Sequence, residues 1–549
     1  MAKKSRQHPE RPRASGAGPH PVAVAIGFAV LALAVYAPAL EGPFFSDDQH
    51  YVERNLYIQN PSLENWIEIW SPTSIVVVMV ENWAPVHLTL HALAWQWFGP
   101  KVFGHHVLGV LMHALGSALL FALLARSGIP RRTALGLAAF FLVAPANVEA
   151  VAWISQLKTS SSLVLALTAL LLHPRRPGLA LLAFGLALLA KPTAAVALPV
   201  ALVFCWARRE PASSLAWLGG WAAAFAGFAA AELAAFFETA GRAVSLYDGP
   251  AEQLRSQVAI AFRYALMAIG GWKLSLFHEP AAARSWLDPW WFGGLALVVA
   301  IAWRSVTLVR RRSQELGYWV WAVASFAPVS GIVALPYPMA DRYLYFILPG
   351  LLGALAFALP EAWQRFGPAP SARSRSAAAV VAVLGIAAFG FAANRHATLW
   401  ADPELLLART ERVYPDGQIA RLRSAYRAAA AGDGDAATRQ LREAVGRGFD
   451  RLDVLLSDPV YVALRGHAGF DALVDQLARG MVEHLAARTD PSQAELRVLA
   501  QARIVLRDLA GAERAYRRSL EIDGPYAEAI ERELALLLRD RRFEAIRKR

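Results

Sequence analysis

Cysteine is almost absent from the sequence, and charge is scarce. The single cysteine, Cys205, lies within an apolar run, which excludes intramolecular disulfides and sites that need several thiolates. Only 18% of the 549 residues are charged, whereas 56% are hydrophobic. Soluble globular domains rarely combine these values, so the composition excludes that class and indicates a polytopic membrane protein.

Long apolar runs supply the predicted membrane spans. A helix needs about 20 apolar residues to cross the hydrocarbon core of a bilayer, where lipid offers the backbone no hydrogen-bond partner. After a basic leader over residues 1–20, the sequence predicts an all-α membrane domain over residues 21–394. No small-residue cleavage site follows the first apolar run, so we expect an uncleaved span there. The eleven predicted spans are 21–40, 102–125, 133–148, 160–172, 179–190, 194–206, 214–237, 290–309, 318–335, 343–359 and 377–393.

Basic residues set the predicted orientation. The net charge is +12, but many basic residues cluster in short loops between spans, as the positive-inside rule expects, which argues against nucleic-acid binding. With eleven spans these clusters all fall on one face, which we interpret as cytoplasmic. The N-terminus is then inside and the C-terminus outside. The clusters are residues 3–4, 131–132, 175–176, 208–209, 310–312, 373 and 375.

Two features leave this topology open. Residues 179–190 and 194–206 are short for two spans, and we separate them at "AKPT" because one long helix would leave the next basic pair on the wrong side. Residues 257–277 are apolar but carry two basic side chains, so we expect a re-entrant or interfacial segment. Fusing the short pair and letting residues 257–277 span also gives eleven.

Residues 395–549 differ sharply in composition from the rest. They are rich in Ala, Arg, Leu and Asp and contain no spanning run, which predicts a water-soluble helical domain. The small-large-small spacing of tetratricopeptide repeats occurs twice, separated by slightly over two periods of about 34 residues. We favour a tetratricopeptide-like array over ordinary helical hairpins. The two matches are Ala437, Leu441 and Ala444, and Ala512, Tyr516 and Ser519.

The loop over residues 41–101 follows the first span on the outer side and holds two adjacent carboxylates, Asp47 and Asp48. A solvated helix end would account for such a pair, because charge near a membrane must be solvated, paired or placed in a polar cavity. The loop is too long for a simple turn and contains several tryptophans, which indicates an amphipathic cap on the outer surface. Asp47 and Asp48 are therefore candidate catalytic residues.

Histidines offer a candidate metal or acceptor site. His87 and His91 are four residues apart on one helical face, which is the spacing of a two-histidine metal site. The sequence fixes no third ligand, so an interfacial pair stays the alternative. His105, His106 and His113 pose the same question at the start of the next span, where packing or hydrogen bonding is the more common use.

Further polar residues fall on the same outer face. Glu149 follows "PAN" at an outward turn, where it can approach the Asp pair. Lys191, at the outward apex of the short helical pair, offers a cation to a lipid phosphate. Arg342 begins another span, and its planar fork suits phosphate, with an interfacial anchor as the alternative. Carboxylates and cations beside apolar surface suit a lipid-phosphate donor.

Four stretches carry a resemblance to a known family. Their order, ahead of tetratricopeptide-like helices, resembles that of the transmembrane-and-tetratricopeptide O-mannosyltransferases and their bacterial relatives, which belong to the GT-C glycosyltransferase superfamily. The resemblance covers most of residues 40–360 and the tail. The stretches are "VFGHHVLGVLMHALGSALLFALL", "VAPANVEAVAWISQLKTSSSLVLAL", "LLAKPTAAVALPVAL" and "ADRYLYFILPG".

The resemblance implies a hexosyltransferase that uses a polyprenyl-phosphate sugar on the lumenal or periplasmic side. An acidic residue after the first span of that family acts as general base or binds a divalent metal ion, and here it matches Asp47 or Asp48. Glu149 matches the acid of the family's "VEAV" motif, while Lys191 and Arg342 match basic positions expected at the donor phosphate. We expect a protein or glycan hydroxyl as acceptor, held by residues 398–549.

Two motifs depart from the family pattern. Relatives often have "RPL" where this chain has "APV" (84–86), and "GRKD" or "GRAE" where it has "QLKT" (156–159). An arginine and an acid are thus missing, which favours a second hypothesis, a catalytically inert membrane scaffold whose tail recruits periplasmic partners. A transporter ranks third, because we find no internal repeat of membrane halves. The Ala- and Arg-rich bias suggests a high-GC bacterium, so we expect an inner-membrane protein with a periplasmic C-terminal domain.

Overall fold

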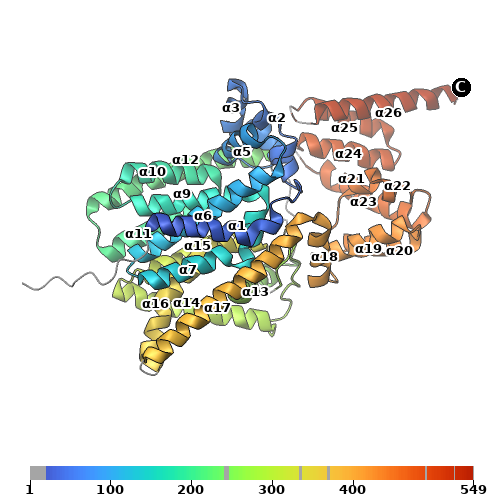
Figure 1. The fold of residues 1–549 in the computed structure, drawn as a ribbon. Helices are drawn as coiled ribbons and strands as arrows, with labels where there is room; N and C mark the ends of the chain where they lie inside the picture. Colours follow the sequence, from blue (N-terminus) through green and yellow to red (C-terminus); the bar gives the residue numbers. More distant parts are fainter. Residues whose placement is uncertain are drawn as a thin grey trace, which may run out of the picture.

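The computed structural model describes residues 20–239, 247–271, 273–332, 337–367, 371–488, 491–522, 524 and 526–547. Across these ranges the chain is almost entirely helical, and its only β pairing is an isolated bridge between His278 and Met339. Long helices lie side by side in a bundle, and a second body of shorter helices is attached at one end of it (Figure 1). The all-α fold predicted from the sequence is confirmed.

The bundle is built from the apolar segments predicted as spans, and each of the eleven segments overlaps one of its helices. Residues 1–19 of the predicted leader, and residues 333–335 of one predicted span, lie outside the described residues. The bundle helices are α1 (Pro21–Tyr36), α6 (Val102–Arg126), α7 (Arg131–Val143), α8 (Val148–Ala152), α9 (Leu157–Leu172), α10 (Pro177–Ala190), α11 (Ala197–Arg208), α12 (Ala212–Thr239), α13 (Pro250–Gly270), α14 (Pro289–Arg311), α15 (Glu315–Phe326), α16 (Leu344–Phe366) and α17 (Ala372–Ala397). Single turns join several of them: η1 (Ala37–Ala39), η3 (Pro145–Asn147), η4 (Ile154–Gln156), η5 (Pro192–Val196), η6 (Ala327–Val329), η7 (Asp341–Tyr343) and η8 (Thr398–Ala401).

Seven of the described helices are long and apolar enough to cross a membrane, or eight if the pair bent by 51° at Ala144 forms one span. Helices α10 and α11 are shorter and apolar. The chain is therefore a multi-pass membrane protein, while the count of eleven spans stays a prediction. Helix α13, within which most of residues 257–277 fall, is not among the candidate spans.

The chain reverses direction between α10 and α11, as expected from the "AKPT" stretch. Helix α10 ends at Ala190, and Arg208 at the end of α11 lines one pocket with His173 and Pro174, which precede α10. There the Arg208 guanidinium donates to Gln314 Oε1 at 2.6 Å and to Ser127 Oγ at 3.3 Å. Arg126 lies within electrostatic range of both Arg208 and Arg175. One end of the bundle thus gathers arginines from several connections.

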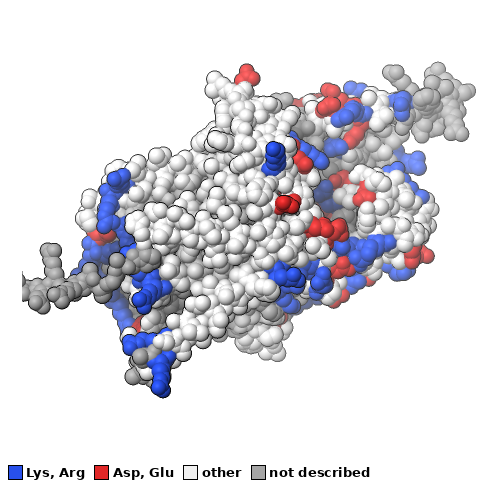
Figure 2. Space-filling view, in the orientation of Figure 1, with Lys and Arg blue, Asp and Glu red and all other residues white. Residues whose placement is uncertain are grey.

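Charge is distributed unevenly over the surface. On the face shown in Figure 2, Lys and Arg gather at the bundle end remote from the C-terminal helices, and the waist between the two ends is almost free of charged side chains. A surface of this kind suits a bilayer, because charge at the centre of a membrane is costly. We call the end that adjoins the C-terminal helices the outer end.

A small cap covers part of the outer end. It consists of a π-helical turn, η2 (Gln49–Glu53), and helices α2 (Leu56–Gln59), α3 (Leu63–Trp70), α4 (Ile75–Val80) and α5 (Pro85–Phe98). Its core joins Tyr51, Ile58, Ile69 and Leu88 to Ile154 of the bundle. The residues of the predicted outer loop are thus packed onto the turn that precedes α9.

The C-terminal body consists of helices packed in succession. In its pairs α19/α20 and α24/α25, the later helix packs on the earlier one, and the six residues that match the tetratricopeptide spacing are buried. The tetratricopeptide assignment stays a prediction. The helices are α18 (Pro403–Val413), α19 (Gln418–Ala430), α20 (Gly434–Val445), α21 (Leu452–Ser457), α22 (Pro459–Val462), α23 (Ala468–Ala486), α24 (Gln493–Val505), α25 (Leu509–Leu520) and α26 (Ala527–Arg547).

Candidate active site at the outer end of the bundle

The adjacent carboxylates Asp47 and Asp48 lie in different surroundings. Asp48 is 2% exposed, and its two oxygens accept the backbone N–H groups of Phe45 at 3.1 Å and Ser155 at 2.7 Å. Burial raises the pKa of Asp48 to about 7, although both hydrogen bonds act in the opposite direction. Through its two hydrogen bonds, Asp48 ties the cap to the turn before α9. Ser46, two residues earlier, has φ +53°, the left-handed conformation that non-glycine residues rarely adopt.

Asp47 is half-buried, and its side chain accepts a hydrogen bond from Ser46 Oγ at 3.3 Å. It lies within electrostatic range of both Lys158 and Arg342. Of the two carboxylates, Asp47 is therefore the one that is left open to a ligand beside cations.

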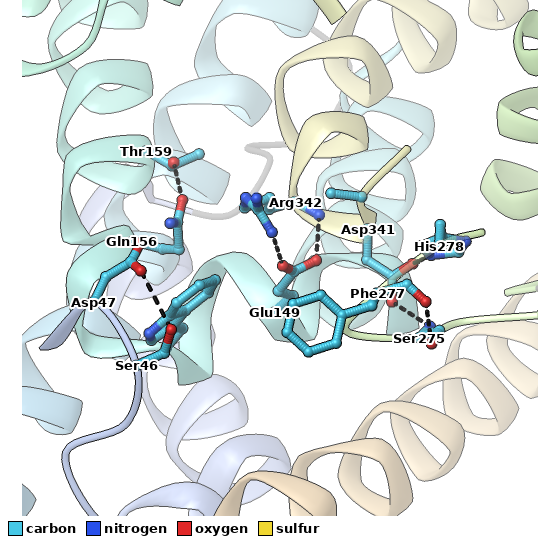
Figure 3. Close-up of polar contacts among 12 residues, drawn as sticks. Ser46, Asp47, Glu149, Gln156, Thr159, Ser275, Phe277, His278, Asp341 and Arg342 are labelled. Atoms are coloured by element: carbon cyan, nitrogen blue, oxygen red, sulfur yellow. Dashed lines mark hydrogen bonds and ion pairs between the residues drawn. The ribbon is translucent and has the colours of Figure 1, made fainter. Parts of the chain in front are cut away.

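Arg342 is held by a buried carboxylate and two aromatic rings. Glu149 in α8 is 1% exposed; one of its oxygens pairs with the guanidinium and the other accepts the Arg342 backbone N–H at 2.8 Å. The guanidinium carbon lies 5.3 Å from the Trp153 ring centroid and 5.1 Å from that of Tyr343. Figure 3 shows this pair with Thr159 and Gln156 on one side and Asp341 and His278 on the other. The two residues predicted from separate motifs, Glu149 and Arg342, are in direct contact.

Two lysines complete a group of three cations. Lys191 Nζ donates to Thr159 Oγ1 at 2.7 Å, and Lys158 Nζ donates to the Tyr51 hydroxyl at 3.1 Å and lies 4.5 Å from that ring's centroid. Lys191 is within electrostatic range of Lys158 and Arg342, and Lys158 is within range of Arg342. Neither lysine forms a salt bridge with a carboxylate among the residues that the structure describes.

Sequence reasoning missed Lys158, because it treated the residue only as part of a departure from the family's motif. A usable signal was present: a lone lysine in the first turn of an apolar helix, at its outward end, is a polar residue that a membrane protein rarely places there without a ligand or partner.

The histidines of the cap pack against one another. The Nε2 atoms of His87 and His91 are 2.8 Å apart, a hydrogen-bonding distance shorter than the roughly 3.3 Å that separates two nitrogens bound to one tetrahedral zinc ion. Burial lowers the pKa of His91 to about 3 and also lowers that of His87, so both rings are neutral. His106 uses its Nε2 to contact Gly42 O at 3.0 Å.

No group of three His, Cys, Asp or Glu residues that could hold a metal ion occurs in the described ranges. The structure places His106 apart from the His87–His91 contact, at the backbone of Gly42. The expectation of a divalent metal ion at these histidines therefore finds no support in the side chains that are placed.

A second polar cluster adjoins Arg342 and involves His278, which the sequence analysis did not single out. His278 Nε2 lies 2.6 Å from Asp341 Oδ1, and both side chains are 1% exposed. Asp341 Oδ2 accepts the backbone N–H of Ser275 at 3.2 Å. No sequence pattern links His278 to Asp341, because they lie 63 residues apart and His278 stands in an irregular loop.

Comparisons with known proteins give little to add to this geometry. No protein-family model matches the chain, and no curated protein matches it. Among solved structures, the chain is similar to ArnT from Cupriavidus metallidurans bound to undecaprenyl phosphate, with 16% sequence identity, over 83% of this chain and 80% of that one. The TM-score is 0.33, which is too low for the likeness to carry a functional conclusion.

Proposed function

We propose that the chain is a GT-C-type membrane glycosyltransferase that moves a sugar from a polyprenyl-phosphate donor to a hydroxyl of a protein or glycan. One observation carries the proposal: Lys158, Lys191 and Arg342 converge at the outer end of an apolar bundle, beside the half-buried carboxylate of Asp47. The resemblance of the sequence motifs to the GT-C superfamily points to the same class.

The three cations suit a lipid phosphate. Within the described residues, two of them hydrogen-bond to hydroxyl groups and to no carboxylate, and a partly buried cation without a bonded carboxylate favours binding of an anion. Arg342 retains 17% exposure of its side chain beside Glu149, and its planar fork can grip two phosphate oxygens at once. Cations in fixed positions stabilise the charge that develops as the phosphate departs.

Asp47 is the proposed general base. The acceptor hydroxyl gives its proton to the Asp47 carboxylate, its oxygen forms a bond to the anomeric carbon, and the bond from that carbon to the phosphate oxygen breaks. Polyprenyl phosphate leaves with the bonding electrons, and the configuration is inverted. Glu149 orients Arg342 through two contacts, while Asp48 fixes the loop that carries Asp47.

The outer end would face the periplasm of a bacterial inner membrane. The arginine-rich end of the bundle would then lie in the cytoplasm, as the positive-inside rule expects. The C-terminal helices adjoin the outer end (Figure 1), so an acceptor segment bound by residues 398–549 would lie on the side of the proposed site.

The test compares Asp47→Asn with Asp48→Asn. Purified protein is incubated with a panel of polyprenyl-phosphate sugars, and release of the lipid phosphate is measured. Asp47→Asn should lower release by about 10²- to 10⁴-fold, the usual contribution of a general base. Undiminished release by Asp47→Asn contradicts the assignment of the base. A wild-type protein that consumes no donor in the panel supports the scaffold hypothesis instead.

A further inference from the structure

A chain of hydrogen bonds leads from the C-terminal helices to the residue next to Arg342. Tyr414, just after α18, has its hydroxyl 2.9 Å from His278 Nδ1, and His278 Nε2 is 2.6 Å from Asp341 Oδ1. His396 of α17 approaches the other carboxylate oxygen, with Nε2 3.8 Å from Asp341 Oδ2. A residue of the C-terminal body is therefore two hydrogen bonds away from the turn η7 that carries Arg342.

The two ring nitrogens of His278 have partners of different hydrogen-bonding capacity. An ionised carboxylate only accepts hydrogen bonds, so His278 Nε2 donates to Asp341. The Tyr414 hydroxyl carries both a proton and lone pairs, so it can donate to His278 Nδ1 or accept from it. Tyr414 thus holds the ring orientation in which His278 contacts Asp341.

The backbone around Arg342 is held from three directions. The Tyr264 hydroxyl of α13 contacts the Ala340 carbonyl at 3.2 Å and the Ala340 N–H at 3.0 Å. The Asp341 side chain is fixed by Ser275 and His278, and the Arg342 N–H is bound by Glu149. A change at Asp341 therefore alters the backbone position from which the Arg342 guanidinium extends.

The loop that carries His278 is itself docked on the C-terminal helices. Ser275 Oγ lies 3.1 Å from Thr410 Oγ1, and Arg409 Nε donates to the Leu274 carbonyl at 3.2 Å. The Glu279 carboxylate accepts the first two backbone N–H groups of α19, where a helix N-terminus favours a negative charge. Helices α18 and α19 thus hold the whole segment that supports Asp341.

We propose that Tyr414 and His278 are positioning residues for Arg342, so that the C-terminal helices take part in sugar transfer itself and not only in holding an acceptor. The inference rests on the proposed function of Arg342 at the donor phosphate. It differs from a pure acceptor-binding role in one respect: a defect at Tyr414 should affect turnover with every acceptor, whatever its size.

The first experiment compares Tyr414→Phe with Tyr426→Phe, the same change at an exposed tyrosine of α19. Lipid-phosphate release is measured with a small hydroxyl acceptor. We expect Tyr414→Phe to lower kcat about fivefold to tenfold, the range for losing one buried hydrogen bond, with an unchanged KM for the acceptor. Tyr426→Phe should match the wild type. Equal kcat values for the two variants, with Arg342→Ala inactive, overturn the proposal.

Two variants of His278 test the donor to Asp341. The amide of His278→Gln can still donate to the carboxylate, whereas His278→Phe cannot. We expect His278→Phe to lower kcat about 100-fold. The kcat of His278→Gln should be at least tenfold higher than that of His278→Phe. A merely structural role would make the two variants equally defective, and that result contradicts positioning through the hydrogen bond.

Hydrogen–deuterium exchange separates failure of this inference from failure of the proposed function, because it needs no turnover. The backbone amide hydrogens of residues 340–345 should exchange faster in Tyr414→Phe than in Tyr426→Phe. If the wild type consumes no donor but this difference is found, the coupling between Tyr414 and the turn that carries Arg342 is supported, and the proposed glycosyltransferase function is rejected. Equal exchange in the two variants overturns the coupling.

Discussion

The two ends of the bundle use charge in opposite ways. At the arginine-rich end, Arg304 donates to both oxygens of Glu315, at 2.8 and 2.6 Å, and also pairs with Glu361. Arg311 pairs with the other oxygen of Glu361 at 2.6 Å. These bonds join α14, α15 and α16, so Arg304 and Arg311 are paired within the protein and hold helices together.

At the outer end, cations outnumber the carboxylates that bind them. Arg342 has Glu149, but Lys158 and Lys191 contact only the hydroxyls of Tyr51 and Thr159 in the part of the chain that is described. Leaving partly buried cations without a bonded carboxylate lowers stability. The comparison teaches that bonding to a carboxylate distinguishes Arg304 and Arg311, which join helices, from Lys158 and Lys191.

Among the tests of this comparison between the two ends, the largest effect on activity is expected for Arg342→Lys, with Arg304→Lys as the matched change at the other end. Arg342→Lys keeps the charge but loses the fork that contacts Glu149 and would grip the phosphate, so lipid-phosphate release should fall about 100-fold, the range for losing an electrostatic stabiliser of the transition state. Arg304→Lys should lower the thermal midpoint while leaving kcat near that of the wild type. The comparison between the two ends fails if Arg304→Lys lowers kcat as much as Arg342→Lys does.

A smaller effect is expected from removing an unpaired lysine. Lys158→Met and Lys191→Met should each weaken the binding of polyprenyl phosphate about tenfold, because a hydrogen bond to a charged group is lost, and should reduce the dependence of Kd on salt. The same variants should unfold at the same or a higher temperature than the wild type, since a half-buried cation that bonds no carboxylate among the described residues is replaced by an apolar chain.

Arg311→Met is the matched control at the other end of the bundle. It breaks the pair with Glu361 and should leave the Kd for polyprenyl phosphate unchanged. Lysine variants that bind the lipid phosphate as well as the wild type does would show that the outer cations serve some purpose other than anion binding.

The sequence was sufficient to predict the helices, because the signal for each helix is local. Apolar runs predict helices one by one, because each run must satisfy its own backbone in lipid, and all eleven predicted segments overlap helices. The predicted alternation of the spans puts Glu149, Lys191 and Arg342 on one face, which stays a prediction, and Glu149 and Arg342 are in contact in the structure.

The sequence was insufficient to predict side-chain positions that depend on contacts between distant segments. Asp48 turns inward because a backbone N–H of Ser155, 107 residues later, binds it, so no local pattern separates it from Asp47. The contact of His278 with Asp341 depends on a loop docked against the C-terminal helices. Side-chain pairing of this kind is set by tertiary packing, which hydropathy and spacing do not encode.

The smallest expected effect concerns the buried member of the acidic pair. Burial raises the pKa of Asp48 from 3.8 to about 7, so the native state keeps a proton that the unfolded chain has already released. The stability from this protonation is present below pH 3.8 and is lost as the pH rises toward 7. Asp48→Asn cannot ionise, so its thermal midpoint relative to the wild type should rise by about 2 °C or more between pH 5 and pH 8. The same substitution at the exposed Asp435 controls for the loss of one charge. If the thermal midpoint of Asp48→Asn relative to the wild type does not change with pH, Asp48 is not held protonated by its buried site.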